Sequence, residues 1–533
     1  MSKEKFLKGA LILTVAGIIV KLIGSVNRIF LSRLLGGEGI GLYQMAYPIY
    51  LLALSVSSAG IPVAISILVA EKVALQDYRG ANRVFRISLS VLTVTGLLFS
   101  VLLYFGAGWL IENHYVRDSR AYYAIAALAP AIFFVTILSS YRGYFQGMQM
   151  MLPTGFSQIA EQLIRVVTMV AFAYFLLPYG LEYAAAGASF GAGPGAVAGL
   201  LVLIYFYWKY RGEFRSKVEN QPILMQEPST SIITRLFKLA LPVSLANIML
   251  PIVSNIDLLI VPPRLEVAGY TVEQATELFG YLTGMAVPLV NMATILTASL
   301  AASLVPSISE AHTLGDKAAI YDRTSTALRI ANLITIPAFV GMWLLATPIS
   351  TMLYATPKAG IPIAISALGI FLLGIHQVTT GVLQGLGRTA IPVVNMAISA
   401  GVKVALSWTL TAMPSLGIIG ASWATIADFG VAAVLNMFFV YRYVGFALDI
   451  KDTLKTSAAA AVMGLVSLGL YELLFGRGIG NTLSTLVAIS VGGGVYALLL
   501  LLLGSIGERE IMKVPVIGGP AVVLLRKFHL LRR

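Results

Sequence analysis

The stretch YRGYFQGMQMMLPTGFSQIAEQLIRVV, Tyr141 to Val167, decides the architecture because the chain repeats its pattern once. Within it, Gly143 opens a Gly-x-x-Gln-Gly turn, and Arg165 lies in the apolar segment that follows. The second copy, GVLQGLGRTAIPVVNMAISAGVKV, begins at Gly381 and carries Lys403 at the position of Arg165. The two glycines and the two basic residues have the same offset in the numbering (381 − 143 = 403 − 165 = 238). A repeat of this length predicts two related halves.

The composition of the whole chain indicates a membrane protein. Of its 533 residues, 58% are hydrophobic and only 11% are charged, whereas soluble domains carry roughly 25% charged residues. The mean hydropathy is +0.86. The formal charge of +13 is explained by the positive-inside rule rather than by nucleic-acid binding. Cysteine is absent, which excludes a disulfide framework and a thiol nucleophile.

Hydrophobic runs of about 20 residues predict membrane-spanning helices. The expected fold is an all-α polytopic membrane protein with about fourteen spans, the first of them a retained helix and not a cleaved signal peptide. The predicted spans are 7–32, 42–70, 84–111, 121–141, 153–178, 184–208, 232–261, 276–309, 324–354, 360–382, 390–412, 416–441, 454–475 and 482–505.

The distribution of Lys and Arg predicts the orientation in the membrane. Segments on the side of the N-terminus carry 27 of the 37 basic residues, the opposite side carries 7, and 3 lie within spans. This bias places both termini in the cytoplasm and favours an even number of spans.

The repeat and the spans together predict five parts. Two pseudo-symmetric six-helix lobes are joined by a linker, and two further helices have no counterpart in the repeat. The predicted parts are an N-terminal lobe (1–209), a basic cytoplasmic linker (210–231), a C-terminal lobe (232–443), the appended helices (444–507) and a basic interfacial tail (508–533).

The first span carries a polar stripe. At 100° per residue, five polar side chains fall within about 60° of one another: Thr14, Lys21, Ser25, Arg28 and Ser32. The stems of Lys21 and Arg28 are about 10 Å apart on this face. Charged groups within a span usually face a polar interior, so the stripe predicts a water-filled cavity that holds an anion. Alternatively, Lys21 pairs with an acid from another helix and Arg28 extends to the outer interface.

The fifth span has a polar face of its own, on which Glu161 and Arg165 stand at positions i and i+4. An acid that precedes a base by four residues is the favoured order for an ion pair on a helix. We therefore predict that this is a structural polar pair that links helices, and not a substrate site.

Embedded carboxylates and amides mark a second candidate site, for a sodium ion or a proton. Asp257 lies in the seventh span, Asn395 and Lys403 in the eleventh and Asp428 in the twelfth. Oxygen ligands of this kind suit a hard cation or a proton. Alternatively, Asp257 or Asp428 only neutralises Lys403. The four histidines are scattered and predict no metal site, and the short outer segments leave no room for a soluble catalytic domain.

Two stretches resemble a known family. EGIGLYQMAYPIYLLALSVSSAGIPVAISILVAEK (Glu38 to Lys72) and YRGYFQGMQMMLPTGFSQIAEQLIRV (Tyr141 to Val166) are similar to the SpoVB branch of the polysaccharide exporters, close to the MurJ-type lipid II flippases. The resemblance extends over essentially the whole chain.

The resemblance implies a V-shaped, alternating-access transporter and not an enzyme. Its cargo would be an undecaprenyl-diphosphate-linked sugar, with lipid II favoured, held in a basic central cavity. The appended helices would form a groove for the lipid tail. The family further implies a location in the bacterial cytoplasmic membrane, contact with membrane lipids, function as a monomer, and no cofactor apart from a transported Na⁺ or H⁺.

The resemblance also assigns roles to single residues. Lys21 matches one basic residue of the family's first helix, and Asn27 takes the place of another, beside Arg28. With Ser25, these residues form the predicted substrate site. Asp257 matches the family's acid in the cation site, and Asn395 could supply its amide. The MurJ pattern adds arginines on the second and eighth spans. These arginines are absent from 41–70 and 278–309 here, so the expected cavity carries fewer positive charges.

Three other functions compete with lipid II transport. The chain could move another lipid-linked polysaccharide, export drugs in exchange for a cation, or act as a membrane glycosyltransferase. A drug exporter is expected to present carboxylates to its cationic cargo, whereas the first span presents Lys21 and Arg28.

Overall fold

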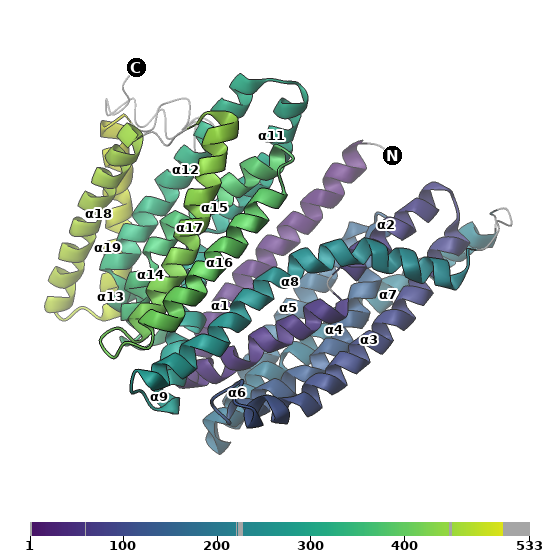
Figure 1. Ribbon diagram of the computed structural model, residues 1–533, viewed down its shortest axis with the longest axis horizontal. Helices are drawn as coiled ribbons and strands as arrows, with labels where there is room; N and C mark the ends of the chain where they lie inside the picture. The colour runs from purple at the N-terminus through teal and green to yellow at the C-terminus, as the bar shows by residue number, and fades with distance from the viewer. Residues whose placement is uncertain (1–2, 59, 220, 222–226, 447–449, 505–533) are drawn as a thin grey trace. The chain divides into compact units, whose positions relative to one another are not determined.

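A computed structural model describes residues 3–58, 60–219, 221, 227–446 and 450–504 (Figure 1). Within these ranges every regular element is a helix and none is a strand, which confirms the predicted all-α class. The predicted interfacial tail, 508–533, lies outside the described residues.

The chain divides into two compact units, Met1–Gly280 and Tyr281–Arg533, called here the N-terminal and C-terminal units. The helices of the N-terminal unit are α1 (Lys3–Ser58), α2 (Ile61–Ala74), α3 (Tyr78–Glu112), α4 (Ala121–Gly147), α5 (Met151–Leu176), η1 (Leu177–Tyr179), α6 (Leu181–Phe190), α7 (Ala192–Glu219), α8 (Ser229–Val267) and α9 (Val272–Phe279). Those that follow are η2 (Gly280–Ala286), α10 (Val287–Ala293), α11 (Ile295–Thr313), α12 (Lys317–Leu344), α13 (Ala346–Tyr354), α14 (Gly360–Ser366), α15 (Leu368–Gly385), α16 (Ala390–Leu410), α17 (Ile418–Val444), α18 (Ile450–Gly476) and α19 (Asn481–Leu502).

Eleven helical segments of the described residues are long and apolar enough to cross a membrane, or twelve if the bent pair Val272–Ala293 and Ile295–Thr313 is one span. The segment Val15–Ala74 counts once among them, although it covers the first two predicted spans. Within it the backbone of Gly36 leaves the helical region, with φ 65°. Fourteen spans are compatible with this arrangement and stay a prediction.

The internal repeat is visible in the helix packing. On α4, a β-carbon added to Gly143 would lie 2.6 Å from the carbonyl oxygen of Pro62, so α2 approaches the glycine backbone closely. On α15, a β-carbon at Gly381 would lie 2.6 Å from the carbonyl oxygen of Ala301 on α11. The next turn repeats the contact, with Gly147 on Ser66 and Val69 and with Gly385 on Val305 and Ile308. The offset between the partners (301 − 62 = 239) agrees with that between the glycines (381 − 143 = 238).

A second crossing is repeated with its two residue types exchanged. Gly96 of α3 packs against Thr136 of α4, whereas Thr335 of α12 packs against Gly374 of α15. The positions correspond at nearly the same offset (335 − 96 = 239 and 374 − 136 = 238). One small and one larger residue fill the same crossing in either order, as close packing of membrane helices requires.

The turns before α3 and α12 are repeated as well. The side chain of Asp77 accepts a hydrogen bond from the backbone N–H of Gly80, at 2.7 Å. The side chain of Asp316 accepts one from Ala319, at 2.9 Å. Both carboxylates cap helix N-termini, where backbone donors lack partners within the helix.

We expect Gly143→Ala to lower stability by about 1 to 3 kcal/mol, the usual cost of overpacking, because the new methyl group would meet the α2 backbone. Thermal melting in detergent measures the effect. The control is Gly106→Ala, since no atom lies within 4 Å of a β-carbon there and the replacement of an unconstrained helical glycine is neutral or stabilising. Equal melting temperatures for the two variants would contradict the packing argument.

The compact units divide at a different place from the predicted lobes. Helix α8 packs against α1, α2 and α3 and so belongs to the N-terminal unit, although the repeat assigns it to the second lobe. The amide nitrogen of Asn255 on α8 donates to the carbonyl oxygen of Pro48 on α1, at 2.8 Å. The lobe boundary at 210–231 stays a prediction.

The two helices without a counterpart in the repeat, α18 and α19, pack on each other and on α12 and α13. The Tyr496 hydroxyl donates to the carbonyl oxygen of Leu333 at 2.9 Å, and Arg329 pairs with Asp452 at 2.7 Å. The pair α18–α19 therefore packs onto the C-terminal unit through α12 and α13.

Candidate functional site

Two basic residues of the α1 stripe carry charge that the N-terminal unit does not neutralise. Lys21 is exposed and Arg28 is half-buried. Within the described part of this unit neither side chain forms an ion pair, so the alternative in which Lys21 pairs with an acid is not seen there. The Ser25 hydroxyl donates to the backbone carbonyl oxygen of Lys21, at 3.0 Å. Fewer side chains of the stripe are accessible than expected, because Ser32 is fully buried. The Thr14 side chain lies outside the described residues.

Asn27 lies on the neighbouring face of α1 and is buried against α5. Its amide nitrogen is 3.4 Å from the sulfur of Met169, and its buried oxygen has no hydrogen-bond partner among the described residues. One turn earlier, a β-carbon added to Gly24 would lie 3.2 Å from the amide nitrogen of Gln162. The polar faces of the first and fifth predicted spans therefore meet along this seam.

The pair predicted from spacing on α5 is present and has a third member. The carboxylate of Glu161 forms ion pairs with Arg165 at 2.6 Å and with Arg142 of α4 at 2.8 Å. Arg142 also donates to the Ser157 hydroxyl, at 2.9 Å. All three charged side chains are less than a fifth exposed. One carboxylate thus joins two helices through two arginines, an arrangement that supports a structural role.

The C-terminal unit contains a buried polar network of its own. The Lys403 ammonium lies 4.0 Å from the carboxylate of Asp428, which accepts a hydrogen bond from Ser399 at 2.7 Å. The alternative in which Asp428 neutralises Lys403 is therefore the one seen in this unit. The amide of Asn395 donates to Asn436 at 2.8 Å, and Asn436 donates to Thr380 at 2.9 Å.

The two networks occupy equivalent positions of the repeat. At the offset of the repeat (403 − 165 = 238), the correspondences are Arg142 with Thr380, Ser157 with Asn395, Glu161 with Ser399 and Arg165 with Lys403. The acid has moved from α5 in one unit to Asp428 on α17 in the other. Each unit therefore uses one carboxylate to stabilise the base at the end of the repeated stretch.

The residues of the predicted cation site lie in different units. Asp257 is half-buried on α8 of the N-terminal unit, and Asn395 is buried on α16 of the C-terminal unit. A shared cation site of Asp257 and Asn395 stays a prediction.

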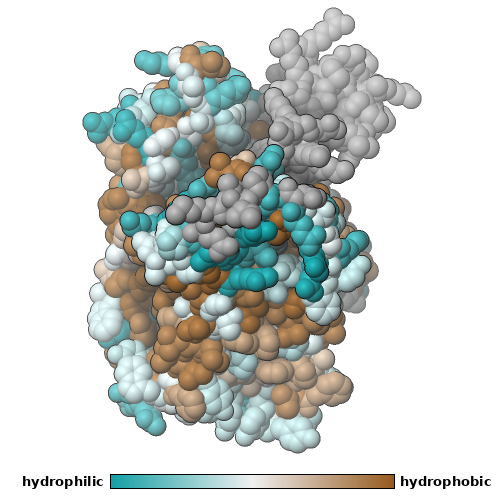
Figure 2. All heavy atoms as spheres, turned by 90° about the vertical axis from the view of Figure 1, so that its right-hand side faces the viewer, coloured by the Kyte–Doolittle hydropathy of each residue, from teal (hydrophilic) through white to brown (hydrophobic). Residues whose placement is uncertain are grey.

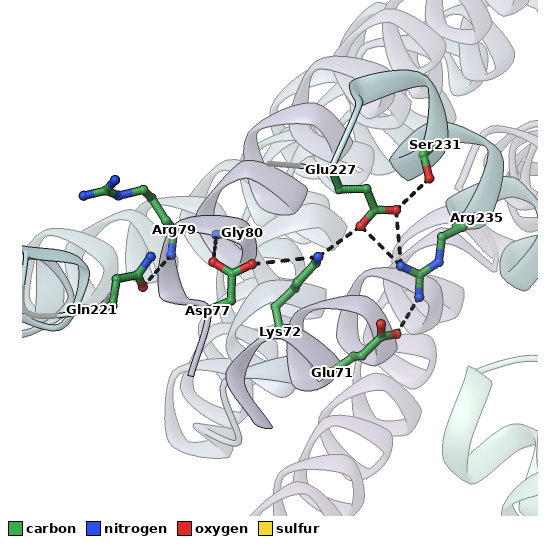
Figure 3. Close-up of polar contacts among 9 residues, drawn as sticks. All are labelled: Glu71, Lys72, Asp77, Arg79, Gly80, Gln221, Glu227, Ser231 and Arg235. Carbon is green, nitrogen blue, oxygen red and sulfur yellow. Dashed lines mark hydrogen bonds and ion pairs between the residues drawn. The ribbon is translucent and has the colours of Figure 1, made fainter. Parts of the chain in front are cut away.

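A network of charged side chains lies where the linker meets α8 (Figure 3). The spacing of residues in the sequence did not predict it. We call it the linker network. Glu227 lies at its centre and contacts Lys72 at 3.0 Å, Arg235 at 3.3 Å and Ser231 at 2.7 Å. Arg235 also pairs with Glu71 at 2.5 Å, and Lys72 also pairs with Asp77 at 3.8 Å. The charges alternate in sign, so each acid is neutralised and α8 is tied to the end of α2. The adjacent opposite charges of Glu71 and Lys72 were a signal in the sequence.

We expect the linker network to weaken in acid. The hydrogen bond from Ser231, followed by the contacts with Lys72 and Arg235, lowers the pKa of Glu227 to about 2. Because the folded pKa lies below the ordinary value of 4.5, the stabilisation is present above about pH 4.5 and is lost as the pH falls towards 2. In this partly hydrated network it amounts to at most about 1 kcal/mol.

Thermal melting of wild type and Glu227→Gln at several pH values checks this expectation. The wild type should melt higher at pH 7, and the difference should shrink as the pH falls below about 4.5. A difference that stays constant down to about pH 3 would contradict it.

Comparison with known proteins decides the family. Residues 6–312, more than half of the chain, match the family described as polysaccharide biosynthesis protein. The chain belongs to this family. Residues 242–409 also match the family described as MatE.

Within the polysaccharide biosynthesis family, the chain is similar to two proteins of Bacillus subtilis (strain 168). It is 32% identical to stage V sporulation protein B over 519 residues, which cover 97% of this chain and 99% of that protein. It is 27% identical to lipid II flippase MurJ over 518 residues, which cover 92% of this chain and 94% of that protein. The resemblance to the SpoVB and MurJ-type branch is confirmed.

A solved structure of this branch shows the same fold. Lipid II flippase MurJ in an inward closed conformation matches with a TM-score of 0.67 and 17% identity, over 92% of this chain and 98% of that chain. At such identity the likeness speaks for the fold alone. Together with the apolar helices, it establishes a multi-pass membrane protein.

Proposed function

We propose that the chain is an alternating-access flippase for an undecaprenyl-diphosphate-linked cell-wall precursor, with lipid II as the favoured cargo. The observation that carries the proposal is the pair Lys21 and Arg28, two cations on one face of α1 that form no ion pair within the described part of the N-terminal unit. Charges kept in a membrane-spanning helix without a partner are costly, and they are expected where they meet a charged cargo.

The chemistry of the cargo fits these cations. A diphosphate is too polar to cross hydrocarbon unaided, and guanidinium and ammonium groups are its natural partners. Ser25 would add a neutral contact, and Asn27, which is buried against α5, would reach the sugar only if the packing of α1 on α5 opened. The apolar surface of α18 and α19, which includes exposed Leu465 and Leu483, would hold the lipid tail.

The membrane potential would supply a driving force. Moving net negative charge outward across an inside-negative membrane is favoured by about 2.3 kcal/mol per charge per 100 mV. Entry of a cation at Asp257 would then reset the empty carrier.

Proteoliposomes containing the purified chain test the proposal. We expect a fluorescent undecaprenyl-diphosphate-linked sugar to cross faster when an inside-negative potential is applied. The match to the MatE family favours drug export as a second candidate. In the same vesicles, transport of a cationic dye without transport of the lipid-linked sugar would favour drug export and overturn the flippase proposal.

Asp257→Asn is expected to abolish the dependence of transport on sodium or proton gradients, because the amide cannot bind or release the ion as a carboxylate does. The loss should approach the rate measured without a gradient. Transport rates with and without each gradient measure it, and Asp322→Asn, which alters an exposed acid on α12, is the control. Unchanged ion dependence in the Asp257 variant would retire this assignment.

A further inference from the structure

A cavity of about 480 Å³ lies in the N-terminal unit where α3, α4 and α7 meet. Its aromatic wall is firmly packed: the ring of Tyr144 lies 4.5 Å from Phe85 and 6.1 Å from both Tyr207 and Phe214, centroid to centroid. One wall of the cavity is therefore built from aromatic rings in mutual contact. We call it the arginine pocket.

The charge of the arginine pocket is of one sign. Arg86 of α3 and Arg211 and Arg215 of α7 line it, and no acid does so among the described residues. Arg215 forms an exposed ion pair with Glu219 at 2.9 Å. Arg86 and Arg211 form no ion pair within the described part of the unit. Both side chains are exposed, so water solvates them and an anion in the pocket can reach them.

The neighbouring acids are already engaged. A second cavity of about 330 Å³ adjoins the arginine pocket and shares Asn82 and Arg86 with it. Its acids, Asp77 and Glu227, belong to the linker network, where Lys72 pairs with both (Figure 3). They do not cancel the charge of Arg86 and Arg211.

A buried polar atom beside the pocket also lacks a partner among the described residues. The side-chain oxygen of Asn82 is buried and has no hydrogen-bond partner among the described residues. Buried polar atoms are rarely left unpaired, and each one calls for a partner such as a ligand or a bound water. Since an amide can present either its oxygen or its nitrogen, Asn82 can serve a hydroxyl or an anion in the pocket.

The pocket is formed where α3 begins and near the end of α7. Along α7 it follows Tyr205 and Trp208, whose exposed rings are typical of a membrane interface. Figure 2 looks towards this end of the unit and shows hydrophilic residues beside the grey atoms, above a hydrophobic surface. A ligand can reach such a site from the water or from the lipid headgroups.

We propose that the arginine pocket binds a phosphate-bearing anion, held by Arg86 and Arg211 and bordered by Asn82 and the aromatic wall. Two planar guanidinium groups match the oxygens of a phosphate or diphosphate, and basic pockets between membrane helices suit phosphate headgroups. The site is separate from the α1 stripe and does not depend on the proposed cargo.

Full-length protein in phosphatidylcholine nanodiscs tests the proposal with two probes. Pyrophosphate, titrated from the water and followed by calorimetry, tests the soluble source. Phosphatidylglycerol, exchanged into the nanodiscs and followed by native mass spectrometry of retained lipid, tests the headgroup source. Binding of either probe supports the site, and which one binds identifies the source.

The decisive variant is Arg86→Gln with Arg211→Gln. We expect it to weaken binding roughly 100-fold, because each charge-assisted hydrogen bond contributes about tenfold. Arg388→Gln with Arg442→Gln removes the same charge from the C-terminal unit and should leave affinity unchanged. If the double glutamine variant does not fold, Arg86→Lys with Arg211→Lys keeps the charge, loses the fork and should bind about tenfold more weakly. Failure of both probes to bind wild type, or equal affinity of variant and control, would overturn the proposal.

Discussion

Glu161→Ala is expected to cause the largest loss of stability of any single replacement considered. The carboxylate of Glu161 receives both Arg142 and Arg165, and its removal leaves two mostly buried guanidinium groups without a counter-charge. Breaking a buried ion pair costs about 3 to 5 kcal/mol. We expect a large drop in the melting temperature in detergent and a low yield of folded protein.

A matched control separates this effect from the simple loss of a salt bridge. Glu219→Ala also removes the acid of an i, i+4 pair with arginine, but the side chains of this pair, Arg215 and Glu219, are 75% and 62% exposed. Exposed pairs contribute only about 0 to 1 kcal/mol. Similar melting temperatures for the two alanine variants would show that Glu161 does not hold α4 and α5 together.

Lys21→Ala combined with Arg28→Ala is expected to abolish function without unfolding the protein. Neither side chain forms an ion pair within the described part of its unit, so stability should change by no more than about 0.5 kcal/mol per residue. Loss of two charged contacts with a diphosphate should reduce transport by at least about 100-fold. Growth of cells depleted of their own flippase, with protein level checked by immunoblot, measures the effect.

The control for this variant removes two exposed cations elsewhere, Lys238→Ala and Arg442→Ala. It should restore growth as well as the wild type does. Full rescue by the Lys21 and Arg28 variant, at a normal protein level, would refute the idea that these cations meet the cargo.

The repeat seen in the sequence returns in the helix packing, but the turn predicted at Gly143 to Gly147 is wrong, because these residues form the last turns of α4 and the chain leaves the helix only after them. The glycines at Gly143 and Gly381 mark places where another backbone comes close, and a side chain there would collide. The period of the repeat therefore reflects contacts that both units must make. The pair Glu161 and Arg165 was predictable because helical spacing alone brings its members together.

Contacts between distant parts of the chain could not be predicted in this way. Arg142 reaches Glu161 from another helix, and Glu227 meets Lys72 although the two residues lie far apart in the sequence. Ser32 shares the angular position of Lys21 but is fully buried, because the helical angle of a residue does not say which neighbour covers it. The packing of α8 with the N-terminal unit depends equally on tertiary contacts.

The most direct test of the central claim is to measure lipid II on the outer leaflet of cells depleted of their own flippase that express this chain. Labelling with a probe that does not cross the membrane reports the amount exposed. We expect the wild-type chain to restore outer-leaflet lipid II and the Lys21→Ala, Arg28→Ala variant not to do so. Normal amounts of folded wild-type protein with no restored lipid II would contradict it.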